Sequence, residues 1–153
     1  MGGTRISSQG YVPETTRLLL KAPSGGCTRT LVYEADTSVQ DSDTSRFNTV
    51  KAATSAAENG IFVVAEEDVA AGEWGWFALS GELDITLANG VTAGAALYVF
   101  SSGTLSTDAA DDVTTGDQVK IVGYAYAAPG ASDDIEKCVF NGEYGFGTFQ
   151  GVA

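Results

Sequence analysis

The sequence contains no histidine, and this absence removes several kinds of chemistry at once. Histidine is the commonest general base, the usual partner of serine and cysteine nucleophiles, and the commonest zinc ligand. The only two cysteines, Cys27 and Cys138, are far apart in the chain and form no Cys-x-x-Cys motif. We therefore expect no enzymatic activity, no bound metal and no cofactor. We also expect two buried free thiols, with a disulfide as the alternative.

Long apolar runs and amphipathic helical stretches are missing as well. A membrane-spanning helix needs about 20 consecutive apolar residues, and the sequence has no such run. The first residues lack the apolar stretch of a secretory signal. Leu, Glu, Lys and Arg rarely recur at helical spacing. We expect a protein without long helices and without a membrane partner.

Basic residues are scarce and unevenly placed. The net charge is −12; residues 1–51 contribute +1, from six basic and five acidic side chains, and residues 52–153 contribute −13, from two and fifteen. An acidic body repels phosphate backbones, so we expect no nucleic-acid partner. The acidity either serves solubility alone or marks a solvent-facing body whose near-neutral N-terminal third docks on a partner.

Small residues dominate what is present. Nineteen glycines and many Ala, Ser and Thr are interspersed with Val, Ile, Phe, Tyr and Trp, a composition typical of short strands joined by turns. We predict an all-β fold, a small β-barrel or β-sandwich of short antiparallel strands. Residues 1–33 are predicted to form an extended N-terminal arm with short strands, and residues 34–153 the body. Residues 46–58 are predicted as a strand and loop, with a short helix as the alternative.

A four-residue phrase occurs three times at intervals of 22 residues. It reads Val-Ala-Ala-Gly at 69–72, Val-Thr-Ala-Gly at 91–94 and Val-Thr-Thr-Gly at 113–116, and a predicted strand follows each copy. The equal spacing indicates a repeated structural unit. Near the C-terminus, Asn141-Gly142 lies between aromatic and β-branched residues, which predicts a β-hairpin there.

Alternation along the three repeated strands predicts two faces. One face is consistently apolar and is predicted to form the core; it holds Phe77, Leu79, Leu97, Val99, Val119 and Ile121. The other face holds Trp74, Trp76 and Tyr98, followed by Gln118 and Lys120. Large aromatics on an outward face are covered either by the N-terminal segment of the same chain or by another subunit.

Residues 60–142 resemble the small decoration, or cement, proteins of tailed-phage heads. The resemblance lies in Val69–Phe77 with Ser80-Gly81, in Val91–Val99, in Ile121–Ala125, and in the last strand from Ile135 to Gly142. It implies a small barrel or sandwich on the capsid surface, made in the host cytoplasm, that bridges major capsid protein subunits without catalysis. It further implies self-association, commonly as a homotrimer.

Aromatic and basic side chains and one aliphatic side chain of the N-terminal third and of the outward face are the candidates for contacts with the capsid or between subunits. They are Arg5, Tyr11, Arg17, Leu19, Lys21, Arg29, Trp74, Trp76 and Tyr98. The arm could add a strand to a neighbour's sheet. The alternatives are a tail, fibre or head-fibre subunit, and a glycan-binding β-domain that uses the same aromatic rings.

Overall fold

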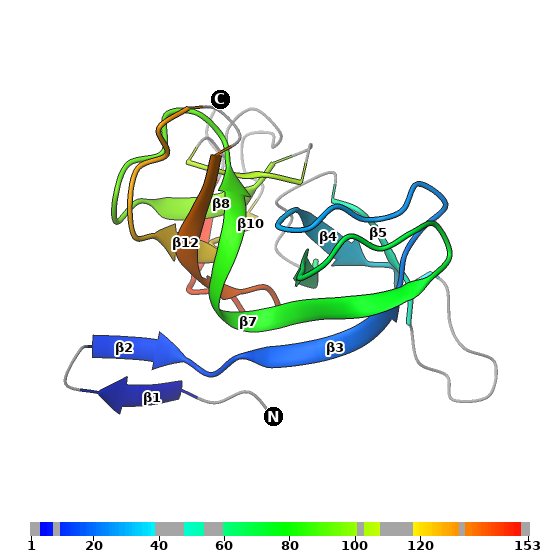
Figure 1. Ribbon diagram of the computed structural model, residues 1–153. Coiled ribbons are helices and arrows are strands. Elements are labelled where there is room, and N and C mark those ends of the chain that lie inside the picture. Colours follow the sequence, from blue (N-terminus) through cyan, green and yellow to red (C-terminus); the bar gives the residue numbers. More distant parts are fainter. Residues whose placement is uncertain are drawn as a thin grey trace.

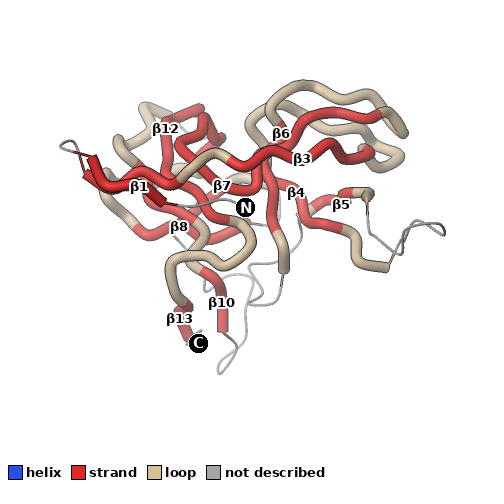
Figure 2. Tube along the Cα trace, turned by 90° about the horizontal axis from the view of Figure 1, so that it is seen from below, coloured by secondary structure: helices blue, strands red, loops and turns tan. Residues whose placement is uncertain are grey.

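The computed structural model describes residues 4–7, 10–38, 48–53, 60–100, 103–107, 118–131 and 134–150. For residues 4–13, 118–119 and 148–150 the description covers the backbone alone. All regular secondary structure in these segments is β, as Figure 2 shows by colour, and it forms a small closed barrel with additional strands. The predicted all-β class is confirmed.

Figure 1 shows the arrangement of the strands. They are β1 (Thr4–Ser7), β2 (Gly10–Pro13), β3 (Thr16–Lys21), β4 (Val32–Ala35), β5 (Val50–Ala52), β6 (Phe62–Ala65), β7 (Trp74–Leu87), β8 (Ala96–Val99), β9 (Leu105–Ser106), β10 (Gln118–Lys120), β11 (Gly123–Ala125), β12 (Asp134–Asn141) and β13 (Thr148–Gln150).

The long strand β7 takes part in two sets of pairings. Its second half pairs with β12, and the neighbours continue through β11, β8 and β9 back to β7, which closes the barrel. Its first half pairs with β3 on one side and with β6 on the other, and β4 and β5 extend the sheet beyond β6. The two halves meet at Ser80–Gly81. One continuous strand therefore joins the barrel to a second layer.

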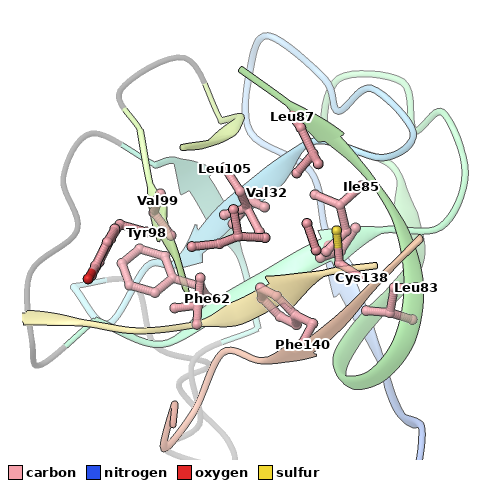
Figure 3. Close-up of a cluster of buried hydrophobic side chains, with 14 of the residues drawn as sticks. Val32, Phe62, Leu83, Ile85, Leu87, Tyr98, Val99, Leu105, Cys138 and Phe140 are labelled. Carbon is pink, nitrogen blue, oxygen red and sulfur yellow. The ribbon is translucent and has the colours of Figure 1, made fainter. Parts of the chain in front are cut away.

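The barrel core is filled by aliphatic and aromatic side chains that converge from strands distant in sequence (Figure 3). Phe62, Ile85, Leu97 and Phe140 are fully buried there. Complete burial of such a side chain contributes roughly 1.5–3 kcal/mol relative to its exposure. The barrel interior is thus a packed core.

A second core lies on the other side of β4 and β6. It is built mainly of Leu20, Ala22, Cys27, Tyr33, Val50, Val63, Ala65, Val69 and Phe77. The rings of Tyr33 and Phe77 meet edge to face with centroids 6.3 Å apart. Along β6, Phe62 and Val64 face the barrel core, whereas Val63 and Ala65 face the second core. Burial of both faces explains why β6 is an unbroken apolar run.

Two copies of the repeated phrase form the same turn. The Glu73 amide donates to the Ala70 carbonyl at 3.0 Å, and the Ala95 amide donates to the Thr92 carbonyl at 3.1 Å. Gly72 and Gly94 have φ of 73° and 78°, the left-handed value that the third residue of a type II turn requires. Each turn leads directly into a strand, β7 or β8. The third copy, at 113–116, lies outside the described residues.

In the N-terminal third, the boundary between arm and body differs from the predicted one. β1 and β2 pair with each other as a hairpin that extends from β3 beneath the barrel (Figure 1). Residues 16–33, which we expected within the arm, belong to the large sheet and the second core. β3 pairs with β7 from Thr16 to Lys21, and the backbone of Cys27 forms an isolated antiparallel β-bridge with that of Val69. Leu18 and Leu20 of β3 pack against the second core, which ties this part of the predicted arm to the body. Of residues 46–58, the described part contains the predicted strand as β5.

Lys120 was expected on a polar outer face, yet it is only 5% exposed. Its ammonium donates to the carbonyls of Gly60, Gly142 and Glu143, the last at 2.6 Å, and lies 5.8 Å from the centre of the Phe62 ring. These bonds tie β10 to the segment that follows β12. In that segment the Asn141 carboxamide oxygen accepts the amides of Glu143 and Tyr144. This side-chain turn redirects the chain, so no hairpin forms across Asn141-Gly142.

Close backbone packing at Gly142 generates a stability prediction. A Cβ at this position would lie 1.7 Å from the Phe62 carbonyl oxygen, whereas a Cβ at Gly25 would have nothing within 4 Å. We expect Gly142→Ala to lower the free energy of unfolding by roughly 1–3 kcal/mol, the usual range for overpacking a core. Gly25→Ala should leave it nearly unchanged. Urea unfolding of the two variants checks this, and equal midpoints would contradict the packing at Gly142.

Candidate interaction surface

Five of the predicted contact residues come together on one side of the β3–β7 pair. The antiparallel register places Leu19 opposite Trp76 and Lys21 opposite Trp74, and Arg17 follows on the same side two residues before Leu19. Directly opposite residues of an antiparallel pair project to the same side of the sheet. We call the surface formed by Arg17, Leu19, Lys21, Trp74 and Trp76 the aromatic face.

The apolar part of the aromatic face is uncovered. Leu19, Trp74 and Trp76 are 50%, 49% and 47% exposed. The N-terminal segment therefore lies beside Trp74 and Trp76, as β3, without covering them. Among the described segments, none buries Trp74 or Trp76.

The opposite side of the same two strands is firmly packed. Leu20 and Phe77 are buried in the second core. Gly75 lies so close to Val69 that a Cβ on it would be 2.3 Å from the valine side chain. Alternation along β7 thus sends each tryptophan outward while its neighbours anchor the strand. The aromatic face is held on a rigid support.

The two basic residues of the aromatic face differ in their partners. The Arg17 guanidinium forms an ion pair with Glu66 at 2.7 Å. Glu66 follows β6, and its amide donates to the Trp76 carbonyl at 3.1 Å, so the carboxylate lies at the border of the face. Lys21 is exposed and forms no ion pair with any of the described residues. The unneutralised positive charge of the face therefore lies at Lys21.

A polar cavity of about 170 Å³ lies next to the aromatic face, between β3, β7 and β12. Asp84 in its lining forms ion pairs with Lys137 at 3.0 Å and with Arg29 at 3.6 Å. Glu82 accepts the Tyr126 hydroxyl at 3.3 Å. Arg29, a predicted contact residue, thus belongs to this ion-pair cluster and not to the aromatic face. We call the ion pairs of Asp84 with Arg29 and Lys137 at this cavity the salt-bridged junction.

Tyr98 was predicted to share the outward face with the tryptophans, and the structure corrects this. Tyr98 is 8% exposed and belongs to the cluster of the barrel core, at the rim of which Figure 3 shows it. Burial raises the pKa of its hydroxyl. Alternation gives the side of a strand to which a residue points, but it does not tell whether another segment covers that side. Phe77 likewise packs in the second core, separate from Leu97 and Val99.

Arg5 and Tyr11 lie in the β1–β2 hairpin, where Arg5 pairs with Val12 and Tyr11 with Ile6. Their side chains are outside the described part of the structure, and the same holds for Val119 in β10. The hairpin itself was not foreseen, because Ser8 and Gln9 carry no turn signature. Its contribution to contacts stays a prediction.

The two cysteines are buried free thiols, as predicted. Cys27 lies in the second core and Cys138 in the barrel core. Burial raises the pKa of the Cys27 thiol to about 11 and that of Cys138 to about 12, so neither is a ready nucleophile near neutral pH. Within the described segments, no cluster of three or more acidic or cysteine side chains could hold a metal ion. No helix in them is long and apolar enough to span a membrane.

The exposure of the aromatic face has a direct optical consequence. Trp74 and Trp76 are the only tryptophans of the chain, and both are about half exposed. We expect the tryptophan emission of the free protein to be red-shifted and readily quenched by acrylamide. Emission at short wavelength, with little quenching, would show that the rings are covered in solution. The fluorescence of this protein therefore reports on the aromatic face alone.

Comparison with known proteins leaves the chain without an assigned relative. No family model, curated protein or solved structure matches it.

Proposed function

We propose that this chain is a virion structural protein that binds the outer surface of a tailed-phage capsid and bridges neighbouring major capsid protein subunits. The observation that carries this proposal is the aromatic face, with Leu19, Trp74 and Trp76 half exposed on a packed sheet. Its role is adhesive and not catalytic. The resemblance of residues 60–142 to head decoration proteins supplies the kind of partner.

The chemistry of the aromatic face suits a protein partner. Tryptophan is enriched at the centre of protein interfaces, where its removal commonly costs 2 kcal/mol or more of binding free energy, to give an order of magnitude. Trp74 and Trp76 already stand on a strand whose other side is buried, so little order has to be gained on binding. A preformed face of this kind favours a high binding affinity for the interface area that it buries.

The resemblance and the aromatic face have both tryptophans in common. Both tryptophans lie within Val69–Phe77, one of the stretches that carry the resemblance, and the repeated turn at Gly72 leads the chain into β7 just before them. The acidic side chains lie mostly outside the aromatic face, which leaves a strongly negative body turned to solvent. This division supports attachment through one face.

The proposed stabilisation of the capsid follows from the interface area that the bound protein adds between capsid subunits. A shell filled with packaged DNA is under outward stress, and a clamp across a subunit junction adds interface that must be broken before the subunits separate. Assembly as a homotrimer, which the resemblance implies, would multiply the attachment points and raise the avidity. The β1–β2 hairpin, which extends from β3, is the second candidate for a contact.

One feature favours a second candidate function, glycan binding. Trp74 and Trp76 lie two positions apart on the same side of one strand, and such aromatic platforms also stack against sugar rings. In that case soluble oligosaccharides would quench or shift the tryptophan emission of the free protein. Capsid particles would do so only if they carried sugars.

Removal of a tryptophan tests the role of the face. We expect Trp74→Ala and Trp76→Ala each to weaken binding to particles of the major capsid protein from the same genome by about tenfold or more, because each ring would fill an interface pocket. Tyr144→Ala is the matched control, since Tyr144 is 79% exposed outside the face. Co-sedimentation at graded protein concentrations measures the affinity. Equal affinity of all three variants would exclude the aromatic face as the contact.

The bridging role makes a separate prediction. DNA-filled particles stripped of this protein should release their DNA at a lower temperature than decorated ones, and adding the protein back should restore the higher temperature. Release can be followed with a DNA-binding dye during heating. The Trp76→Ala protein, added at the same concentration, should restore less. Identical release temperatures with and without the protein would leave attachment intact but remove the stabilising role.

A further inference from the structure

The sequence contains three Asn-Gly pairs, and the structure describes both residues of two of them, Asn89-Gly90 and Asn141-Gly142. Asparagine followed by glycine is prone to self-modification, because glycine has no Cβ to hinder the attack of its nitrogen on the asparagine carboxamide. The folded chain thus holds the same reactive pair in two different environments.

The reaction needs only water as a co-reactant. The glycine nitrogen loses its proton and attacks the asparagine Cγ; the new N–Cγ bond forms, the Cγ–Nδ2 bond breaks, and the carboxamide nitrogen leaves as ammonia. The product is a five-membered succinimide ring. Water then opens the ring at one of its two carbonyls, which gives either aspartate or isoaspartate, in which the main chain runs through Cβ and Cγ. Nothing is oxidised or reduced. The reaction therefore requires a glycine nitrogen without an acceptor and a segment that can turn.

Asn89-Gly90 meets both requirements. Both residues are exposed, in the connection from β7 to β8, and Gly90 has a φ of 88°. Within the described segments, neither the Asn89 carboxamide nor the Gly90 amide has a hydrogen-bond partner. A Cβ built on Gly90 would have nothing within 4 Å, so the space beside it is open. Nitrogen and carboxamide can therefore approach each other in the folded protein.

Asn141-Gly142 meets neither requirement. The Gly142 amide donates to the Leu79 carbonyl at 2.9 Å, and a Cβ at this buried glycine would clash with the Phe62 carbonyl oxygen. The Asn141 carboxamide oxygen accepts two following amides, at 3.2 and 3.0 Å. These bonds polarise the carboxamide, but they also fix its position, and the nitrogen that would attack it is already engaged. Ring closure here has to wait for a local opening of the fold.

We propose that Asn89 is a site of spontaneous deamidation and isoaspartate formation in the folded protein, with the Gly90 nitrogen as the nucleophile, and that Asn141 is spared. The modification goes beyond the proposed function, since it depends on the β7–β8 connection and not on the aromatic face. It turns an exposed amide into a carboxylate and so adds one negative charge to a net charge of −12.

The ends of this connection are fixed on both sides of the site. The Ala88 amide donates to the Leu105 carbonyl at 2.9 Å, and Val91 is 3% exposed in the barrel core. Isoaspartate inserts one more atom into the main chain between these two points, whereas aspartate inserts none. The open space beside Gly90 takes up the added atom, so neither product requires the barrel to unfold.

Ageing of the intact protein tests the inference. The folded protein is incubated in mildly alkaline buffer, digested at acidic pH, and its peptides are quantified by mass spectrometry, with fragmentation that distinguishes isoaspartate from aspartate. We expect Asn89 to convert about tenfold faster than Asn141 or more, because a local opening that costs about 1.4 kcal/mol already lowers a rate tenfold. Ammonia should be released in step with the modified peptide.

The same chain unfolded in urea is the first control. There the two pairs lose their different surroundings, so their rates should become similar, and Asn89 should react at a rate within several-fold of its rate in the folded protein. Equal rates of Asn89 and Asn141 in the folded protein would overturn the inference. So would an Asn89 that converts in urea but stays intact in the folded protein.

A matched variant locates the reaction. Asn89→Gln keeps an exposed amide at this position but would need a six-membered ring, so modified protein should no longer accumulate at residue 89. Asn141→Gln, the same change at the other pair, should leave the conversion of Asn89 unchanged. Release of ammonia by folded Asn89→Gln at the original rate would place the reaction elsewhere and overturn the assignment of Asn89.

Discussion

The molecule depends on a single strand that serves two cores. Along β7 the first half carries Phe77 into the second core, and the second half carries Ile85 and Leu87 into the barrel core. The two halves meet at Ser80–Gly81, where Gly81 has a φ of 132° and lies against Thr15, too close for a Cβ. The Ser80 hydroxyl donates to the Glu14 carbonyl at 2.9 Å across the same junction. A side chain at Gly81 would therefore disturb both layers, and the aromatic face with them.

Local sequence signals predicted the features that local chemistry controls. The repeated phrase predicted two identical turns because glycine alone readily adopts their positive φ, and alternation placed Trp74 and Trp76 outward. The absence of helical periodicity led to the all-β class. These predictions depend on residues close together in the chain, where periodicity and turn chemistry act.

The features that sequence did not give depend on contacts between distant segments. Whether Tyr98 is covered, or Lys120 is enclosed by carbonyls of Gly60 and Glu143, is decided by segments tens of residues away. β3 looked like a free arm because its partner on β7 lies more than fifty residues later. At Asn141-Gly142 the turn signature was real, but the asparagine side chain satisfied the following amides itself, and no returning strand was needed.

The aromatic face is built into the fold. It is backed by the second core, so its two tryptophan rings and Leu19 are held on a packed sheet, and little order would have to be gained there if the face bound a partner. The salt-bridged junction of Asp84, Arg29 and Lys137 joins the strands next to this face.

The two buried thiols lie in different cores, so their reactivity can report local opening of each core separately. Cys27 belongs to the layer that supports the aromatic face, and Cys138 to the barrel. A buried thiol meets a reagent only when its surroundings open. The reactivity of each thiol would therefore report a separate local opening, that of the layer beneath the aromatic face for Cys27 and that of the barrel for Cys138. A partner bound only to the aromatic face would slow the reaction of Cys27 with a thiol reagent and leave the reaction rate of Cys138 unchanged.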